Sequence, residues 1–325
     1  MKAITVKKAG GPEQLQLSEV PIPKPGTGEI LIQTKAAAIN RTDILGRQGK
    51  VAYLPSDILG VEVAGVVVDS NQSDFAEGDF VMGLVNGGGY AEYVVMPAQR
   101  AMKIPAFLTF AEAAAIPEVF LTAYQTLFWI GQLKRKETVL IHAAASGVGT
   151  AAIQLAKQLT DATVIVTAGS DSKLEVARQL GADVLINYKE EDFDQQVLQA
   201  TKGQGVDLIL DFIGASYWQK NLNSIKTGGR WVLIGILGGQ FVEQVDLFQL
   251  MSKCIQLTGT LLTPRSDQYK AELTHDFIQH VFPYFEDHRI KPLIDTKFSL
   301  AEVAAAHSRM EDNRNIGKII LTVAD

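Results

Sequence analysis

The residues best suited to chemistry form a turn of small residues at 144–149, which reads A-A-S-G-V-G. The turn follows an apolar, strand-like run and precedes a helical pattern over 148–159. A turn in this position binds the pyrophosphate of a dinucleotide through backbone N–H groups at the helix N-terminus. Ala144 and Ser146 replace the first two glycines of the usual pattern, and Gly149 keeps the third, where helix and strand pack closely.

We therefore expect Ser146, Gly147 and Val148 to contact the cofactor phosphates. The alternative is a turn of small residues that is needed only for packing. The place of the turn within a series of strand–helix–strand units favours the cofactor.

The end of the next strand, 163–167, indicates which dinucleotide binds. An acidic side chain there would bind the ribose 2′-hydroxyl of NAD, but the strand runs into small residues that include Gly169 and Ser170. Ser170, and Lys173 one turn further, suit a 2′-phosphate, while Asp171 can cap the helix and point away. These residues predict NADPH. The alternative for Lys173 is a solvated surface charge.

Short β-branched runs alternate with helical patterns from about residue 121 to 263. This alternation predicts a parallel sheet with helices on both faces. The predicted strands are 138–142, 163–167, 183–186, 206–212, 230–236 and 255–262, and the predicted helices are 148–159, 172–180, 192–202 and 216–225.

Residues 1–104 are instead rich in glycine, proline and short alternating runs, which predicts a β-rich domain. Residues 266–325 contain two helical patterns and a final strand, which we expect to complete that first domain. The nucleotide-binding part would then be an insertion. The expected domains are 1–120 with 265–325, and 121–264.

Composition limits the kinds of partner. The net charge of −6 at pH 7 argues against nucleic acid and anionic membrane as main partners. The most apolar long region, 104–133, is broken by Pro117 and Glu118 among others, so no membrane span is expected. Cys254 is the only cysteine, which excludes a disulfide within the chain and a cysteine-rich zinc site. With no signal-like N-terminal segment, these features favour a cytoplasmic protein.

Several longer stretches carry a resemblance to one known family. They include "AAAINRTDILGRQG" (36–49), "LGVEVAGVV" (59–67), "AAAIPEVFLTAYQTL" (113–127), "LDFIGASYWQKNL" (210–222) and "NRNIGKIIL" (313–321). On these stretches the chain resembles the zinc-independent medium-chain dehydrogenase/reductases of the quinone oxidoreductase (zeta-crystallin-like) family. In detail it is similar to the tumour-suppressor-inducible branch of that family. The resemblance implies a doubly wound Rossmann sheet inserted into a β-rich, GroES-like catalytic domain.

The zinc-binding positions of the wider superfamily are changed here. Zinc alcohol dehydrogenases carry a cysteine at the position of Asn40 and a histidine at that of Val61, and neither residue is a normal zinc ligand. The five histidines have no metal-binding spacing, so we expect them on the surface or in packing positions. Without zinc to stabilise an alkoxide, the acceptor itself should spread the incoming charge, as a quinone or an enone does.

The resemblance places Asn40, Asp43 and Tyr53 beside the nicotinamide as candidate catalytic residues. Tyr53 lies in a loop that is shorter than in relatives, and its hydroxyl could donate a proton to the nascent quinol oxygen. Alternatives remain open. Asn40 could be a turn residue, Asp43 a helix cap and Tyr53 a structural loop residue.

The remaining cofactor positions also follow from the resemblance. Thr122 is expected near the nicotinamide and Tyr188 near the adenosine phosphate. Each position could instead reflect local turn chemistry. The rest of the cofactor groove would be lined by Ile213, Gly235, Leu237 and Asn315.

The leading hypothesis is an NADPH-dependent quinone reductase that transfers hydride to a conjugated acceptor without zinc. One alternative is an NADPH-dependent enone or enoyl reductase. Another is an NADPH-binding structural or regulatory protein with vestigial activity. Family members pair through the last strand of the nucleotide domain, and residues 254–262 are apolar enough for such an edge, so we expect a homodimer.

Overall fold

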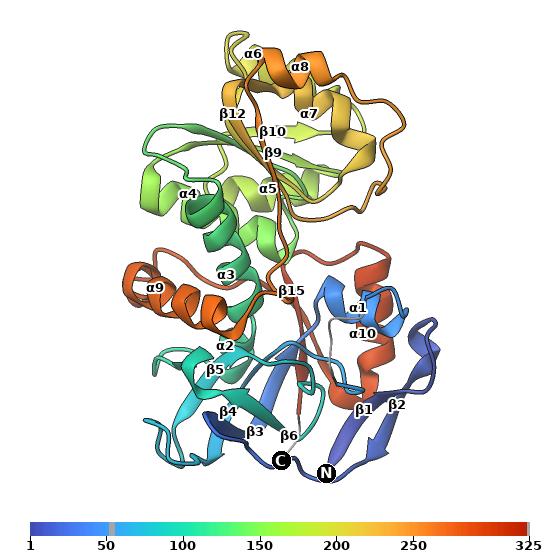
Figure 1. The fold of residues 1–325 in the computed structure, drawn as a ribbon, viewed down its shortest axis with the longest axis vertical. Coiled ribbons are helices and arrows are strands. Elements are labelled where there is room, and N and C mark those ends of the chain that lie inside the picture. The colour runs from blue at the N-terminus through green and yellow to red at the C-terminus, as the bar shows by residue number, and fades with distance from the viewer. Residues whose placement is uncertain (52–55, 324–325) are drawn as a thin grey trace. The chain divides into compact units, whose positions relative to one another are not determined.

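The computed structural model describes residues 1–51 and 56–323, and the chain divides into two compact units. Unit 1 comprises Met1–Leu121 and Leu262–Asp325, and unit 2 comprises Thr122–Leu261. Unit 1 is therefore made from both ends of the chain, with unit 2 inserted between them (Figure 1).

Unit 2 is built on a parallel sheet with the strand order β10-β9-β8-β11-β12-β13. The strand order reverses beside β8, which is the doubly wound topology of a Rossmann sheet. The predicted fold class is thus confirmed for this part of the chain. The strands are β8 (Thr138–Ile141), β9 (Thr163–Ala168), β10 (Val184–Asn187), β11 (Val206–Asp211), β12 (Ile225–Leu233) and β13 (Gln256–Gly259).

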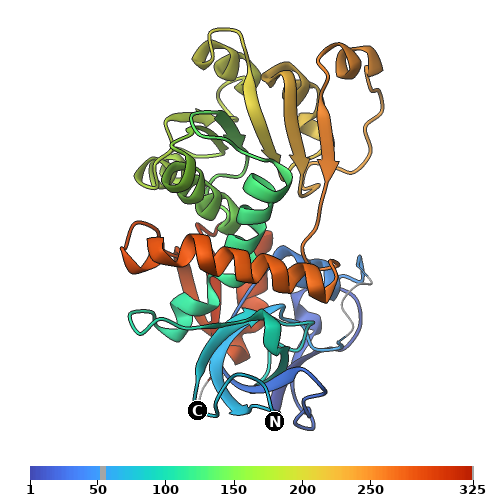
Figure 2. The ribbon, with the colours of Figure 1, turned by 60° about the vertical axis from the view of Figure 1, so that its left-hand side comes forward.

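The helices of unit 2 lie in the chain segments that connect one strand of the sheet to the next. The first two crossovers run from β8 toward β10, and the next two run back from β10 toward β12. Because such crossovers are right-handed, the two pairs of helices cover opposite faces of the sheet. In Figure 2 the strands of this sheet run side by side. The helices are α4 (Gly147–Thr160), α5 (Asp171–Gln179), α6 (Phe193–Ala200), α7 (Trp218–Ser224) and α8 (Leu247–Ser252).

Burial on both faces explains why the unit 2 strands read as apolar runs. Every residue of β11 is buried, and Trp231 on β12 is fully buried against the same core. Strands covered on both faces lose the alternation that marks a half-exposed strand.

Unit 1 contains a mostly antiparallel sheet with the order β14-β15-β3-β4-β5-β7, to which β6 adds beside β3. The last strand, β15, pairs antiparallel with β3 and sets Ile320 opposite Ala38. The strands of this sheet are β3 (Glu29–Ala38), β4 (Glu62–Asp69), β5 (Phe80–Leu84), β6 (Tyr93–Pro97), β7 (Ala101–Lys103), β14 (Ile294–Ser299) and β15 (Lys318–Thr322). A separate two-stranded antiparallel sheet is formed by β1 (Lys2–Val6) and β2 (Leu15–Glu19).

Five α-helices of the described ranges begin in unit 1, and the longest of them, α9, is the red-orange helix labelled in Figure 1. They are α1 (Arg41–Arg47), α2 (Phe110–Ala114), α3 (Pro117–Tyr124), α9 (Asp267–Glu286) and α10 (Val303–Glu311). Within the same ranges, none of the helices combines the length and the apolar character that a bilayer crossing needs.

Some elements carry no clear sequence signal. Strand β14 has only partly buried and exposed residues, so its side chains show no apolar alternation. Helix α3 continues into a π-helical segment, Gln125–Ile130, whose wider turn breaks the ordinary helical period. The strand predicted at 230–236 in fact begins at Ile225 and ends at Leu233.

Candidate nucleotide-binding edge and buried polar cluster

Most of the predicted cofactor residues lie at one edge of the unit 2 sheet. Parallel strands all end at the same edge, and ligands of open α/β sheets bind there. The structure therefore brings these positions together, although their contacts with a cofactor stay predictions. Ser146, Gly147 and Val148 follow β8; Gly169 and Ser170 follow β9; Tyr188 follows β10; Ile213 follows β11; Gly235 and Leu237 follow β12.

The turn after β8 explains how alanine and serine can replace two glycines. Its left-handed residue is Ala143, with φ 51°, so Ala144 and Ser146 need no glycine-like backbone. Ser146 is extended and caps α4, with its Oγ accepting from the Gly149 N–H at 3.0 Å. Gly149 does need to be glycine, because a Cβ there would lie 2.4 Å from the Ala143 carbonyl oxygen.

The N-terminus of α4 is suited to an anion. Among the described residues, the backbone N–H groups of Gly147 and Val148 donate to no protein acceptor. The aligned peptide dipoles of a 14-residue helix add partial positive charge at the same end. Phosphate oxygens are the natural acceptors for this arrangement.

The end of β9 carries no acidic side chain. A Cβ on Gly169 would lie 2.7 Å from the Tyr188 hydroxyl, so Tyr188 closes over this glycine. Ser170 occupies the N-cap position of α5, and Lys173 lies in the first turn of that helix. The expectation that Asp171 caps the helix was wrong, because its carboxylate instead accepts from the Asn187 side chain at 3.3 Å.

The loop after β11 is held by Asp211. One carboxylate oxygen accepts from the backbone N–H groups of Ile213 and Gly214, at 2.7 and 3.0 Å. The other accepts from Asn221 Nδ2 and Trp231 Nε1, each at 3.1 Å. Four donors thus fix a fully buried carboxylate and, through it, the loop that carries Ile213.

His142 extends this network to the glycine turn. Its Nε2 donates to Asn221 Oδ1 at 2.8 Å, and its Nδ1 accepts from the Thr167 hydroxyl at 2.8 Å. Asn221 Oδ1 can only accept, which fixes the tautomer. Burial lowers the pKa of His142, so the ring stays neutral. His142 is buried, as the packing alternative predicted, and it also links β8 to β9 through Thr167 and to β11 through Asn221 and Asp211.

A second group of functional candidates is buried in unit 1. Glu62 on β4 and Lys318 on β15 form an ion pair of 2.6 Å. Lys318 Nζ also donates to Asn40 Oδ1 at 2.7 Å, and Asn40 Nδ2 donates back to Glu62 Oε1 at 2.7 Å. We call Asn40, Glu62, Lys318 and the neighbouring Glu118 the buried polar cluster. Asn40 is the N-cap residue of α1, and both ends of its amide are already hydrogen-bonded.

Asp43 is fully buried in the first turn of α1. Its carboxylate accepts from the N–H groups of Asn40 and Gly60, at 2.9 and 3.0 Å, and from the Tyr90 hydroxyl at 2.9 Å. Burial nevertheless raises the pKa of Asp43 to about 7. Asp43 thus ties the start of α1 to the chain around Gly60, as the helix-cap alternative supposed.

Two further residues predicted from the sequence, Thr122 and Asn315, do not directly follow a strand of the unit 2 sheet as the other cofactor candidates do. Thr122 is buried on α3, and Asn315 lies in the loop before β15, where its Nδ2 donates to the Gly317 carbonyl oxygen at 2.9 Å. Tyr53 lies outside the described residues. The roles assigned to all three stay predictions.

Sequence reasoning missed Glu62, Lys318 and Glu118 as site residues. Each is a charged residue inside an otherwise apolar stretch, such as "GVEVAGVV" or "AAIPEVFL". Charged residues are rarely buried unless they are paired, so these interruptions were the available signal.

The donor set of the described residues does not suit a metal ion. They contain no group of three or more His, Cys, Asp or Glu side chains that could hold one. At the two positions where zinc enzymes have ligands, the chain has Val61 and the fully engaged Asn40 amide. That the protein works without zinc stays a prediction.

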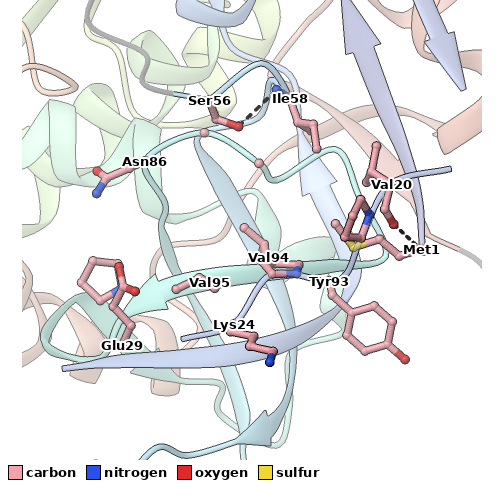
Figure 3. Close-up of a pocket in the computed structure, with 15 residues that line it drawn as sticks. Met1, Val20, Lys24, Glu29, Ser56, Ile58, Asn86, Tyr93, Val94 and Val95 are labelled. Carbon is pink, nitrogen blue, oxygen red and sulfur yellow. Dashed lines mark hydrogen bonds between the residues drawn. The ribbon is translucent and has the colours of Figure 1, made fainter. Parts of the chain in front are cut away.

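A surface pocket of about 390 Å³ in unit 1 lies apart from these candidates (Figure 3). Met1, Lys24, Asn86, Tyr93 and Val95 are among its lining residues. None of the predicted site residues that the structure describes lines this pocket, so it belongs neither to the nucleotide-binding edge nor to the buried polar cluster.

The Rossmann unit and the β-rich unit together define the medium-chain dehydrogenase/reductase class. Residues 26–106 match the family described as "Alcohol dehydrogenase GroES-like domain", and residues 147–278 match "Zinc-binding dehydrogenase".

Relatives that align with nearly all of this chain show which family within this class it belongs to. Human "Quinone oxidoreductase" is 31% identical, with 99% of this chain and 97% of the relative aligned. The zebrafish (Danio rerio) "Synaptic vesicle membrane protein VAT-1 homolog" is 33% identical over 99% of this chain and 70% of the relative. The Escherichia coli quinone oxidoreductase, solved as a complex with NADPH, superposes with a TM-score of 0.90 at 31% identity, covering 99% and 100% of the two chains. The chain belongs to the quinone oxidoreductase family, whose members are oxidoreductases that bind a nicotinamide cofactor.

We predict that Gly149→Ala disrupts the turn after β8. The added Cβ would meet two carbonyl oxygens, of Ala143 and Ala144, at 2.4 and 2.8 Å. Urea denaturation should show a loss of about 1–3 kcal/mol in unfolding free energy. A fluorescence titration should show nicotinamide dinucleotide affinity reduced at least about tenfold, which corresponds to about 1.4 kcal/mol. Gly259→Ala, in the same unit with open space around the new Cβ, is the control. Unchanged affinity in Gly149→Ala would contradict the geometry.

Proposed function

We propose that this protein reduces quinones with NADPH by hydride transfer to a conjugated acceptor, without zinc. The observation that carries the proposal is the strand edge of unit 2. The N-terminus of α4, which follows β8, has backbone N–H groups that can bind an anion. No acidic side chain lies at the end of β9, and Gly169 is followed there by Ser170 and by Lys173 in the first turn of α5. This arrangement suits a dinucleotide with a 2′-phosphate.

The residues of unit 2 would hold the cofactor mainly through backbone groups. Gly147 and Val148 would bind the pyrophosphate, and Ser170, Lys173 and Tyr188 would surround the 2′-phosphate. When bound, NADPH supplies a hydride from its nicotinamide ring. The network through Asp211 and His142 keeps the two loops in place before the cofactor arrives, which lowers the ordering cost of binding.

Unit 1 would contribute hydrogen-bonding groups and no metal ligand. Asn40 and Asp43 act by holding α1 and the chain near Gly60, because their polar atoms are already paired. Tyr53 is proposed to donate to the acceptor oxygen. A quinone or an enone spreads negative charge over its own oxygen, so such donors suffice in place of a Lewis acid. The acidic composition and single cysteine also support a cytoplasmic location.

The cofactor and the acceptor can be tested together by steady-state kinetics. We expect NADPH to be preferred over NADH in kcat/KM with a naphthoquinone as acceptor. Lys173→Ala should reduce that preference about 10- to 100-fold, since a charge-assisted contact contributes roughly 1.5–3 kcal/mol. Arg178→Ala, which removes an exposed cation from the same helix, is the matched control.

The same assay should be repeated with a chelator and with a 2-enoyl thioester. Full activity in the presence of the chelator is expected. A preference for NADH that Lys173→Ala leaves unchanged would contradict the NADPH assignment. Faster turnover of the enoyl thioester would favour the enoyl reductase alternative, and NADPH binding without turnover of any acceptor would favour a non-enzymatic role.

We further propose that the protein is a homodimer paired through β13. This strand lies at the end of the unit 2 sheet, and all of its residues are exposed. The preceding helix α8 exposes Phe248 at 77% and Met251 at 73% of their surfaces. An exposed edge strand next to a large apolar surface is a ready site for pairing with a second copy.

Leu257→Arg on β13 should convert the dimer to a monomer, because charge and bulk would enter the apolar edge. Leu17→Arg, at an apolar side chain of similar exposure on β2, is the matched control and should remain dimeric. Analytical ultracentrifugation at micromolar concentration measures both. A wild-type mass of one chain would contradict the proposed dimer.

A further inference from the structure

Gly169, the first residue after β9, is covered by two side chains from the turn that follows β10. A Cβ added to Gly169 would lie 2.7 Å from the Tyr188 hydroxyl oxygen and 3.1 Å from Lys189 Cε. Both distances are shorter than an ordinary van der Waals contact, so the two side chains lie directly against the end of β9. They already occupy the space that a side chain at position 169 would need.

The backbone holds this turn in place. Asn187, the last residue of β10, pairs with Ala168 in the sheet, and the Tyr188 N–H donates to the Ala168 carbonyl oxygen at 3.2 Å. The Asn187 side chain then accepts from the Lys189 N–H at 3.3 Å, and its carbonyl oxygen accepts from the Glu190 N–H at 3.0 Å. Lys189 therefore projects from a backbone that is fixed against β9.

No acidic side chain neutralises the Lys189 ammonium group. Within the described part of the chain, this group takes part in no ion pair and no hydrogen bond. The carboxylate of Asp171 accepts instead from the Asn187 side chain, at 3.3 Å. Glu190 and Glu191, which follow Lys189 directly, form no ion pair among the same residues. The end of β9 thus carries a positive charge that no protein group compensates.

The place of this charge in the fold indicates what it could bind. In a Rossmann sheet, the residue at the end of the second strand meets the ribose of the adenosine half of the cofactor. Gly169 occupies that position here, and an acidic side chain there would bind a 2′-hydroxyl group. The space for such a side chain holds a lysine and a tyrosine hydroxyl instead, and both are donors that suit a phosphate group.

We propose that Lys189 is a specificity-determining residue that binds the 2′-phosphate of NADPH. The inference rests on the proposed NADPH-dependent function and adds a cation that the sequence pattern did not indicate. Lys189 Cε lies over Gly169, and the ammonium nitrogen is one bond further along a flexible side chain. It therefore reaches a phosphate group at the end of β9 without a movement of the backbone. Lys173 belongs to α5, so the two cations come from different elements.

Lys189→Ala tests this role without disturbing the turn. The contact with Asn187 is made by the backbone N–H of residue 189, and the side chain is exposed, so the unfolding free energy in urea should be unchanged. Lys189→Arg keeps the charge and should keep the function. Lys134→Ala is the matched control, because Lys134 is an exposed lysine that precedes β8, at the opposite end of the parallel strands.

The first readout is the binding of adenosine 2′,5′-bisphosphate and of 5′-AMP to the full chain, measured by isothermal titration calorimetry. The two nucleotides differ only in the 2′-phosphate, and no acceptor is needed. We expect the wild type to bind the bisphosphate more tightly. Lys189→Ala should weaken bisphosphate binding about tenfold and leave 5′-AMP binding unchanged, because only a charge-assisted contact with the 2′-phosphate is lost. Lys189→Arg and Lys134→Ala should bind both nucleotides as the wild type does.

The second readout is the kinetics of NADPH and NADH with a naphthoquinone as acceptor. Lys189→Ala should raise the KM for NADPH about tenfold at unchanged kcat, because a contact far from the reacting ring contributes equally to the ground state and the transition state. The kinetics with NADH should be unchanged. A loss of kcat/KM with both cofactors would show a structural role and overturn the proposal.

The outcomes separate the two proposals. A wild type that prefers the bisphosphate, with a Lys189→Ala variant that keeps this preference, would overturn the role of Lys189 alone. A wild type that binds the bisphosphate and 5′-AMP equally would overturn the NADPH assignment and the role of Lys189 with it.

Discussion

The buried ion pair between Glu62 and Lys318 is the interaction on which unit 1 depends. The two residues are 256 positions apart, and their pairing fastens the last strand of the chain to β4. A buried ion pair is stable only when further hydrogen bonds satisfy the donor and acceptor atoms that the two partners do not satisfy in each other. The Asn40 amide, the Ile39 carbonyl oxygen and the Glu118 N–H supply those bonds. The pair therefore also positions the starts of α1 and α3.

In unit 2 the feature that must be held in place is the edge of the sheet where the parallel strands end. The turn after β8 offers backbone N–H groups there, and these groups can bind a ligand only if the loops around them keep their shape. Asp211 and His142 provide this through hydrogen bonds that join the ends of β8, β9 and β11. The strand edge of unit 2 and the buried polar cluster of unit 1 are thus each held in one arrangement by hydrogen bonds within their own unit.

The sequence was most informative where periodicity is strong. The alternating strands and helices of unit 2, and the turn at 144–149, could be predicted because local patterns specify them. The pairing of Glu62 with Lys318 could not, since no local pattern links residues so far apart. Asp43 shows the same limit. Its type and spacing fit both a catalytic acid and a helix cap; the three donors around it show the cap contacts, which no local pattern revealed, and its catalytic role stays a prediction.

A double-mutant cycle at Glu62 and Lys318, followed by urea denaturation, tests the central role of this ion pair most directly. Lys318→Met alone should lower the unfolding free energy by about 3–5 kcal/mol, because it leaves the Glu62 charge buried without its partner. Adding Glu62→Gln should restore a large part of that loss, so the two substitutions should be strongly coupled. Two small effects that simply add would show that the pair does not hold unit 1 together.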